Sequence, residues 1–341
     1  MWIHKEECKN IIQNAWRSCR DINTPGGLAF SLKHCAADLV IQVWYDSFDF
    51  QRQLAVARQY GAVISATRFD SFDDVISAIP YWVTNEMNRE LIKEFTKDEV
   101  LSALKQMHPI KALGPNGMSA IFFQKYWDIV GTSVTNMAFN VLNFHMPIAE
   151  INRTNIAFVP KKNSHTKMTE FRLISLSNVT YKIIAKVLSN RLKAVLPQII
   201  TKNQSAFLSE RLITDNILVA FEVMHYLNNK REGKESLMAV KLDMSKAFGR
   251  VEWGFIEAVM EKLEFHEWWI SLIMHCITTV MYSILIYGMA YGCITPSRGL
   301  RQGDPLSTYL FILCVECLSS LINQATRTRE LNDISISRGC P

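Results

Sequence analysis

The chain has 341 residues, which is enough for two or three domains and a sizeable hydrophobic core. Hydrophobic residues make up 49% of the sequence and charged residues 20%, a balance that excludes an intrinsically disordered protein. The net charge of +5 is modest, so attraction to a polyanion would have to come from a local cluster of basic residues.

The N-terminal third is predicted to be helical. Residues 1–95 carry few motifs that bear on function, and we expect a helical N-terminal extension there. A firmer helix is predicted from Thr96, because Thr96 and Glu99 match a capping box in front of an apolar run. This helix should end before a Gly/Pro turn at residues 111–120, with further helix up to Phe144.

Two strands and two helices are expected next. The strands are Ile156–Val159 and Phe171–Leu176, both rich in β formers. An amphipathic helix with a 3.6-residue apolar period is predicted over Asn178–Leu196, with Pro197 as its stop. Another helix is predicted over Ile213–Leu227.

A strand ending in a carboxylate is predicted in the middle of the chain. Leu237–Leu242 is rich in β formers and runs into Asp243, and Met244–Phe248 resembles a tight turn that enters a helix. One carboxylate at a strand end, beside backbone amides of the following turn, suits a magnesium–triphosphate complex. The same pattern also suits an aspartate that only caps a helix.

The remaining elements are predicted from periodicity and from Pro and Gly positions. Asp304-Pro305 is expected to start a long helix, because Pro favours the first helical position. The expected elements are helices Trp253–Leu263, Trp268–Thr279 and Leu306–Gln324, a hairpin over Tyr282–Ile294, and a last strand over Asp333–Ser337.

One apolar run is long enough to cross a membrane. The thirty residues Trp268–Ser297 contain no Asp, Glu, Lys or Arg. Gly288, Gly292 and Pro296 interrupt the run, which favours a short helix and a hairpin in the core over a membrane span.

Basic residues concentrate between Arg153 and Lys202. This stretch holds ten Lys and Arg residues and one acidic residue, Glu170, which favours contact with nucleic acid. Lys161 follows the first predicted strand and Arg172 begins the second, so the two side chains could clamp a triphosphate. The alternative is a solvated surface.

The eight cysteines favour a reducing compartment. They are scattered, form no disulfide ladder and follow no signal peptide, so we expect an intracellular protein of the nucleus or cytoplasm. Cys314 and Cys317 form a CxxC in an apolar helical pattern without a second pair, and we expect them to be buried and not to bind zinc.

Five ordered blocks resemble the reverse transcriptase of non-LTR (LINE-type) retrotransposons, particularly of plants. They are QMHPIKALGPNGMSAIFFQKYW, FRLISLSNVTYKIIAKVLSNRLK, RLITDNILVAFEVMH, KLDMSKAFGRVEW and SRGLRQGDPLSTYLF. The resemblance runs from about Phe95 to the C-terminus and, more faintly, through the first ninety residues. It implies an α+β fold, a right-hand polymerase with fingers and a partial palm. We expect a helical N-terminal extension at residues 1–95, fingers at 96–235 and the partial palm at 236–341.

The resemblance also implies roles for individual residues. Asp243 matches the first carboxylate of a site for two Mg²⁺ ions, with the Met244 carbonyl beside it. Phe248 matches the aromatic gate that excludes a ribose 2′-hydroxyl. The implied triphosphate ligands are Lys161 and Arg172, the implied nucleotide and template loop is Gln302 and Gly303, and Arg211 is implied to touch the template. The implied partners are an RNA template, a DNA primer and deoxynucleoside triphosphates, with no membrane.

This sequence departs from the family pattern at several positions. The family has Pro at the positions of Leu113, Leu173 and Thr308, Asp at those of Asn116 and Gly249, and Gly at that of Glu210. The paired aspartates of the family would follow Pro341, so we expect a C-terminally truncated and inactive fragment with an open sheet edge and poor solubility. The alternatives are a non-catalytic nucleic-acid-binding remnant and, less favoured, a membrane-associated protein.

Overall fold

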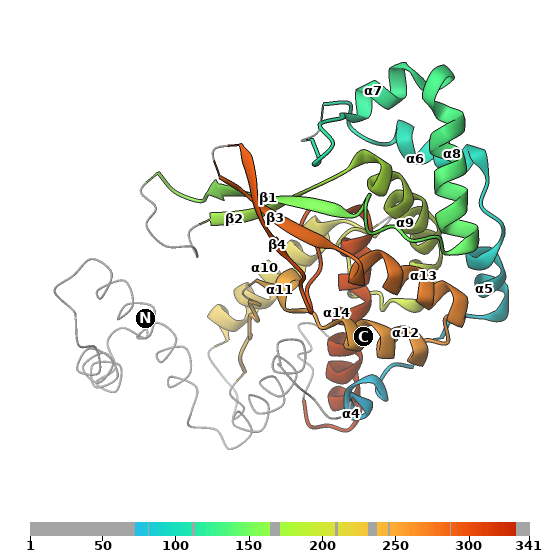
Figure 1. Cartoon of the computed structure of the whole chain (residues 1–341). Helices are drawn as coiled ribbons and strands as arrows, with labels where there is room; N and C mark the ends of the chain where they lie inside the picture. Colours follow the sequence, from blue (N-terminus) through green and yellow to red (C-terminus); the bar gives the residue numbers. More distant parts are fainter. Residues whose placement is uncertain are drawn as a thin grey trace.

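The computed structural model describes residues 72–80, 82–110, 113–163, 171–208, 211–230, 237–244, 246–286 and 288–331. Residues 1–71 of the helical extension predicted at residues 1–95 lie outside these ranges, and so does the strand predicted at Asp333–Ser337. The described part combines helices with one small sheet, as Figure 1 shows. The α+β class is therefore confirmed.

Two helices form the centre of the fold. The central pair is α9 (Val179–Ile199) and α14 (Pro305–Arg327), which pack on each other. Against α9 also pack α5 (Asn85–Ile92), α6 (Lys97–Lys105) and α8 (Trp127–Phe144), and against α14 pack α4 (Asp73–Ile76) and α12 (Trp253–Lys262). The remaining helices of the described ranges are α7 (Ala120–Lys125), α10 (Ile213–Asn229), α11 (Ala247–Arg250) and α13 (Glu267–Thr278).

The sheet joins two hairpins through one parallel pair. Its order is β2-β1-β3-β4, where β1 is Arg153–Pro160, β2 is Phe171–Ser177, β3 is Met281–Ile286 and β4 is Met289–Ile294. The pairs β1–β2 and β3–β4 are antiparallel, and β1 runs parallel to β3. The predicted strands at Ile156–Val159 and Phe171–Leu176 and the hairpin over Tyr282–Ile294 are thereby confirmed.

The long helix α9 supplies much of the core. Its buried side chains follow the apolar period read from the sequence, and Ile183, Ile184 and Leu188 are fully enclosed. The prediction that Pro197 stops this helix is wrong, because α9 continues to Ile199. A proline this close to the end of a helix removes only one backbone donor, and burial of the apolar residues around it offsets that loss.

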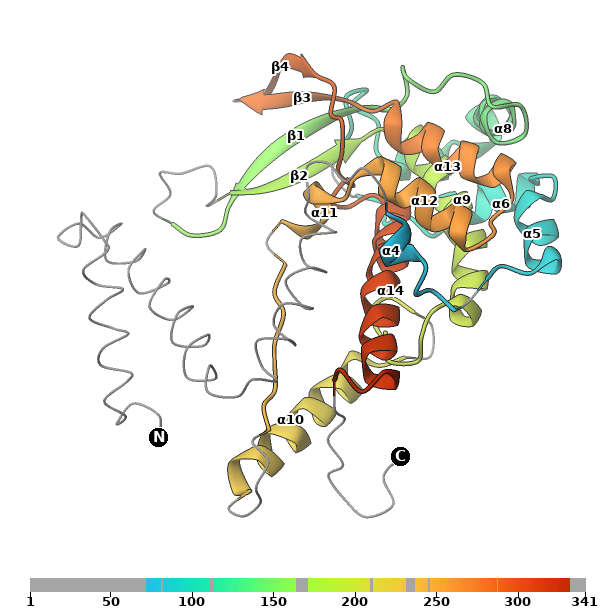
Figure 2. The same cartoon turned by 90° about the horizontal axis from the view of Figure 1, so that it is seen from below.

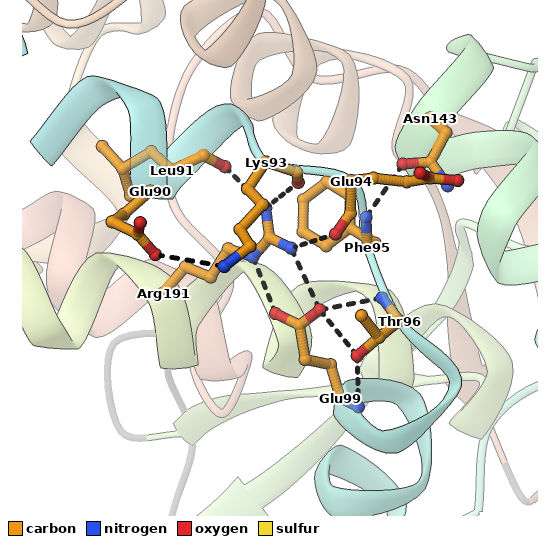
Figure 3. A network of polar contacts seen from close by, with 9 residues as sticks. All are labelled: Glu90, Leu91, Lys93, Glu94, Phe95, Thr96, Glu99, Asn143 and Arg191. Atoms are coloured by element: carbon orange, nitrogen blue, oxygen red, sulfur yellow. Dashed lines mark hydrogen bonds and ion pairs between the residues drawn. The ribbon is translucent and has the colours of Figure 1, made fainter. Parts of the chain in front are cut away.

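One arginine of α9 fastens the segment between α5 and α6, as Figure 3 shows. The Arg191 guanidinium donates to both carboxylate oxygens of Glu99, at 2.7 and 3.0 Å, and to the backbone carbonyls of Leu91, Lys93 and Glu94. It also lies 3.6 Å from the centre of the Phe95 ring. Arg191 belongs to the basic stretch of the sequence, yet its charge is used inside the fold.

The capping box predicted for α6 is present. The Glu99 amide donates to Thr96 Oγ1 at 3.3 Å, and the Thr96 amide donates to the Glu99 carboxylate at 2.8 Å. Partial burial acts to raise the pKa of Glu99, but hydrogen bonds from Arg191 and Thr96 and the Arg191 charge outweigh it and lower that pKa. Glu99 therefore caps the N-terminus of α6 and anchors α6 on α9.

The strand predicted at Leu237–Leu242 is wrong. Residues 237–244 have no regular structure, and Val240 and Leu242 are exposed. A strand requires hydrogen bonds from a neighbouring strand, and the described sheet ends at β2 and β4 without pairing this segment. High β propensity in the segment is therefore not sufficient to make it a strand.

The apolar run Trp268–Ser297 divides as predicted, into α13 followed by the hairpin of β3 and β4. Within the described ranges, one helix, α14, is long and apolar enough to cross a membrane. Of its most apolar window, 56% is buried in the fold, and a core helix passes the same test of length and composition. Cys314 and Cys317 lie on this helix and are buried, as expected.

Candidate nucleic-acid and nucleotide site

A glycine turn leads into α14. Gly303 has a φ of +96°, a left-handed conformation that favours glycine. The next residue, Asp304, caps the helix by accepting a hydrogen bond from the Leu306 amide at 2.9 Å, and Pro305 occupies the first turn. The predicted site residues Gln302 and Gly303 are exposed at this turn.

A buried arginine holds the base of the same turn. The Arg301 guanidinium, 4% exposed, forms an ion pair with Asp304 at 2.8 Å and donates to Asn152, Thr154 and the carbonyl of Cys276. Burial acts to lower the pKa of Arg301, but the groups around it, Asp304 among them, raise it, so the guanidinium keeps its charge.

The same guanidinium lies 3.9 Å from the centre of the Tyr181 ring on α9. Arg301 thus joins α9, the start of β1, α13 and the cap of α14. Sequence reasoning missed this group, because its partners are far apart along the chain and no local motif marks them.

The helix α11 lies against the segment that precedes the glycine turn. The Leu300 amide donates to the Phe248 carbonyl at 2.7 Å, and the ring of Phe248 stacks on Phe311 with centroids 4.6 Å apart. Gly299, with a φ of +94°, packs so closely that a Cβ there would lie 3.1 Å from the Gly249 carbonyl oxygen. The structure therefore brings the predicted gate residue Phe248 next to the segment that continues into Gln302 and Gly303.

Asp243 and Met244 precede α11 in the irregular segment. Asp243 is exposed and has no hydrogen bond or ion pair with any residue that the structure describes. Carboxylate and carbonyl oxygens are the ligands that Mg²⁺ prefers, but two protein donors do not complete its octahedral shell. In the described ranges no group of three or more His, Cys, Asp or Glu side chains is placed to hold a metal ion.

The predicted triphosphate ligands share one end of the β1–β2 hairpin. Arg172 pairs with Val159 across the hairpin, and Lys161 directly follows the last residue of β1. Both side chains are exposed. Figures 1 and 2 both show α11 near this hairpin.

Arg211 is placed differently from the other candidates. Its guanidinium donates to the carbonyls of Ile200, Thr201 and Gln204, and thereby closes the loop after α9. The contact of Arg211 with template stays a prediction, and these bonds give the residue a structural role as well.

A cavity of about 300 Å³ lies on the α9 side of the glycine turn. It is formed where the end of α6, the start of α7, α9 and the beginning of α14 meet. Its lining includes His108, Lys182, Lys186, Gly303, Asp304 and Thr308. From the sequence, Lys182 and Lys186 are expected to project away from the apolar face of this helix, towards solvent or phosphates, and their spacing of four places them on one helix face.

Comparison with known proteins identifies the family. The sequence model of the reverse transcriptase (RNA-dependent DNA polymerase) family matches residues 159–338, more than half of the chain. An uncharacterized 149 kDa protein of transposon TX1 from Xenopus laevis is 30% identical over 265 residues, which are 75% of this chain and 19% of that protein. A Pol polyprotein of the type-1 retrotransposable element R2 from Popillia japonica is 21% identical over 224 residues, which are 64% of this chain and 29% of that protein.

A third relative, an uncharacterized mitochondrial protein of Arabidopsis thaliana, is 54% identical over 57 residues, which are 17% of this chain and 47% of that protein. This chain belongs to the reverse transcriptase family, and its relatives place it with the non-LTR, LINE-type retroelements. It spans about a fifth to a half of the length of these three relatives.

Proposed function

We propose that this chain forms the fingers, residues 96–235, and part of the palm, residues 236–341, of an RNA-directed DNA polymerase of a retroelement. The main structural support for this proposal is the placement of the predicted nucleotide-binding residues. The helix that bears Phe248 is bonded to the segment running into Gln302 and Gly303, and Figures 1 and 2 show this helix near the hairpin that bears Lys161 and Arg172. A nucleotide bound there would meet an aromatic ring, two cationic side chains and a flexible backbone turn.

In this proposal, Lys161 and Arg172 bind the triphosphate, Phe248 contacts the sugar, and Gln302 and Gly303 position the nucleotide against the template. Asp243 and the Met244 carbonyl supply part of the metal shell. Mg²⁺ ions, when bound, neutralise charge on the transferred phosphoryl group and on pyrophosphate. The partners are an RNA template, a DNA primer and deoxynucleoside triphosphates, in the nucleus or cytoplasm.

The test is binding of an RNA template annealed to a recessed DNA primer, measured by fluorescence anisotropy in 50 mM salt with Mg²⁺. We expect the complementary deoxynucleoside triphosphate to tighten binding, because it bridges the protein and the template. The variants Lys161→Gln and Arg172→Gln should lose this tightening. Arg153→Gln, at the other end of β1 and paired on the surface with Glu150, should keep it. A chain that does not bind the template–primer would overturn the proposal.

We propose further that residues 1–341 by themselves do not extend a primer. The two-metal reaction needs several carboxylates, and the resemblance assigns one of them, Asp243, to this sequence. Primer extension on an RNA template with Mg²⁺ should therefore give no product. Template-dependent extension that is lost in Asp243→Ala would refute inactivity while supporting the polymerase assignment.

A non-catalytic RNA-binding role is the second candidate, supported by the basic stretch from Arg153 to Lys202. The structure weakens the support from this basic stretch in part, because the charge of Arg191 is paired with Glu99 inside the fold. The binding experiment separates the two candidates. RNA binding that weakens with salt but does not respond to the complementary triphosphate would favour the non-catalytic role.

A further inference from the structure

A second cavity, of about 270 Å³, lies beside the C-terminal half of α14. It is formed where the segment after α4 passes α14, and Figure 1 shows α4 beside this part of the helix. Residues 77–80 form one part of its lining, and α14 contributes Ser320, Asn323, Gln324 and Arg327. These four residues lie roughly 20–35 Å along the helix from Pro305, so the cavity is remote from the glycine turn.

The α14 residues of this cavity offer hydrogen-bond donors without partners in the part of the chain that the structure describes. Asn323, Gln324 and Arg327 form no side-chain hydrogen bond or ion pair there. The Ser320 hydroxyl is buried and also lacks a partner, whereas the hydroxyl of neighbouring Ser319 donates to the carbonyl four residues earlier at 3.4 Å. A buried polar group without a partner is costly, so a ligand that accepts hydrogen bonds is favoured here.

The four side chains share one face of α14. They follow each other at intervals of one, three or four residues, and residues three or four apart are neighbours on a helix surface. Arg327 offers a planar fork of N–H donors, and two amides and a hydroxyl lie along the same face. None of the described lining residues is acidic. The cavity therefore suits an acceptor ligand with a negative charge.

The charge of the cavity separates one class of anion from another. Arg327 is the one charged residue of the described lining, and its guanidinium balances a single negative charge. Arg327 is also the last residue of α14, where the helix carbonyls add partial negative charge that disfavours a dianion such as phosphate. A carboxylate carries one charge, and its two coplanar oxygens match the guanidinium fork with two hydrogen bonds.

From this arrangement we propose that the cavity beside α14 binds a carboxylate group. Arg327 is its ion-pair partner, and the side chains of Asn323 and Gln324 donate hydrogen bonds to it, with the Ser320 hydroxyl below them. The carboxylate belongs to a free small acid or to an acidic residue of a polypeptide. The site is separate from the groups proposed to bind nucleotide and does not depend on that function.

The experiment uses the full 341-residue chain and two carboxylate probes, observed by saturation-transfer difference NMR. The probes are propionate and the peptide acetyl-Gly-Glu-Gly-amide, which carries the same group on a polypeptide backbone. The neutral peptide acetyl-Gly-Gln-Gly-amide has nearly the same shape and should bind about tenfold more weakly than the glutamate peptide, because it cannot form the ion pair. Tighter binding of the glutamate peptide than of propionate would support a polypeptide as the source, and binding of propionate alone would support a free acid.

Variants of two arginines near the end of α14 test the site itself. Arg327→Gln should weaken carboxylate binding about tenfold, and Arg327→Lys, which keeps the charge without the fork, about threefold. The matched control is Arg329→Gln, which removes the same charge from an exposed arginine outside the described lining and should change binding less than about twofold. Because Arg327 is exposed and makes no contact of its own with the described residues, Arg327→Gln should keep the wild-type melting temperature.

A further variant and three outcomes decide the matter. Asn323→Asp places a carboxylate in the lining and should prevent binding of both probes. Equal binding of the glutamate and glutamine peptides, equal losses in Arg327→Gln and Arg329→Gln, or tighter binding of inorganic phosphate than of propionate would each overturn the proposal. A wild-type chain that binds the carboxylates but no template–primer would refute the proposed function and leave the carboxylate site in place.

Discussion

Glu316 is a buried carboxyl group on α14, with 0% of its surface exposed. It accepts hydrogen bonds from the Thr201 amide at 3.1 Å and from the Thr201 hydroxyl at 3.2 Å. Burial raises its pKa to about 7, against the opposing effects of Thr201 and of the Arg211 charge. The loop after α9, closed by Arg211, is therefore attached to a residue that titrates near neutral pH.

The raised pKa predicts a specific pH dependence of stability. In the unfolded chain Glu316 loses its proton near pH 4.5, whereas the folded protein holds it up to about pH 7. The folded state thus binds more protons in this window, and the free energy of unfolding falls as pH rises from 4.5 to 7, by about 3 kcal/mol from this group.

Glu316→Gln keeps an acceptor for the Thr201 amide and removes the charge. Thermal denaturation should show the variant to be more stable than wild type at pH 8 and equal to it near pH 4.5; equal melting temperatures at pH 8 would contradict the assignment.

The Arg301–Asp304 ion pair gives a second prediction for single residues. Arg301→Met leaves the buried Asp304 carboxylate without its cation, and should lower the free energy of unfolding by about 3–5 kcal/mol. Asp304→Asn keeps the helix cap but leaves the cation unpaired. In urea denaturation, the double variant should lose about 1–3 kcal/mol less than the sum of the single losses. Additive losses would mean that the two charges do not depend on each other.

At the scale of elements, short sequence motifs correctly predicted the helix ends that are determined by interactions between neighbouring residues. The capping box fixed the start of α6, and Asp304-Pro305 fixed the start of α14. Leu237–Leu242 failed as a strand, because a strand depends on a partner that its own residues do not specify. The grouping of Phe248 with Gln302 and Gly303 followed from the resemblance. The Arg301 network could not be predicted, because Arg301 and its partner Asn152 are well over a hundred residues apart in the sequence and no motif links them.

Two glycines near α11 should respond oppositely to substitution. Gly249 lies in the helix, and a Cβ there would meet nothing within 4 Å, so Gly249→Ala should stabilise the chain by about 0.5–1 kcal/mol. Gly299 has a φ of +94° and would place its Cβ against Gly249, so Gly299→Ala should destabilise the chain by more than 1 kcal/mol. Thermal melts of the two variants check this. A stabilising Gly299→Ala would show that α11 can move away from residues 299–301.

At the scale of the whole molecule, α10 differs from the other long helices. It has no buried residue, and Figure 2 shows it extending away from the remaining helices. Ile213, Ile217, Phe221 and Met224 follow a helical spacing along it, and each is between 49% and 68% exposed. An apolar face of this size is unfavourable in water and should bind a second copy of the chain at micromolar concentrations.

We expect the isolated chain to self-associate through this face. The variant Ile217→Lys/Phe221→Lys/Met224→Lys should shift the mass measured by light scattering towards the monomer, because three charges cannot be buried in such a contact. The control Ile110→Lys/Ile129→Lys/Phe144→Lys adds the same charge at apolar residues that are 74–77% exposed and lie elsewhere in the fold. If charge alone governs solubility, both variants become monomeric to the same extent. If α10 is responsible, only the first does, and a wild-type chain that is already a monodisperse monomer would contradict self-association altogether.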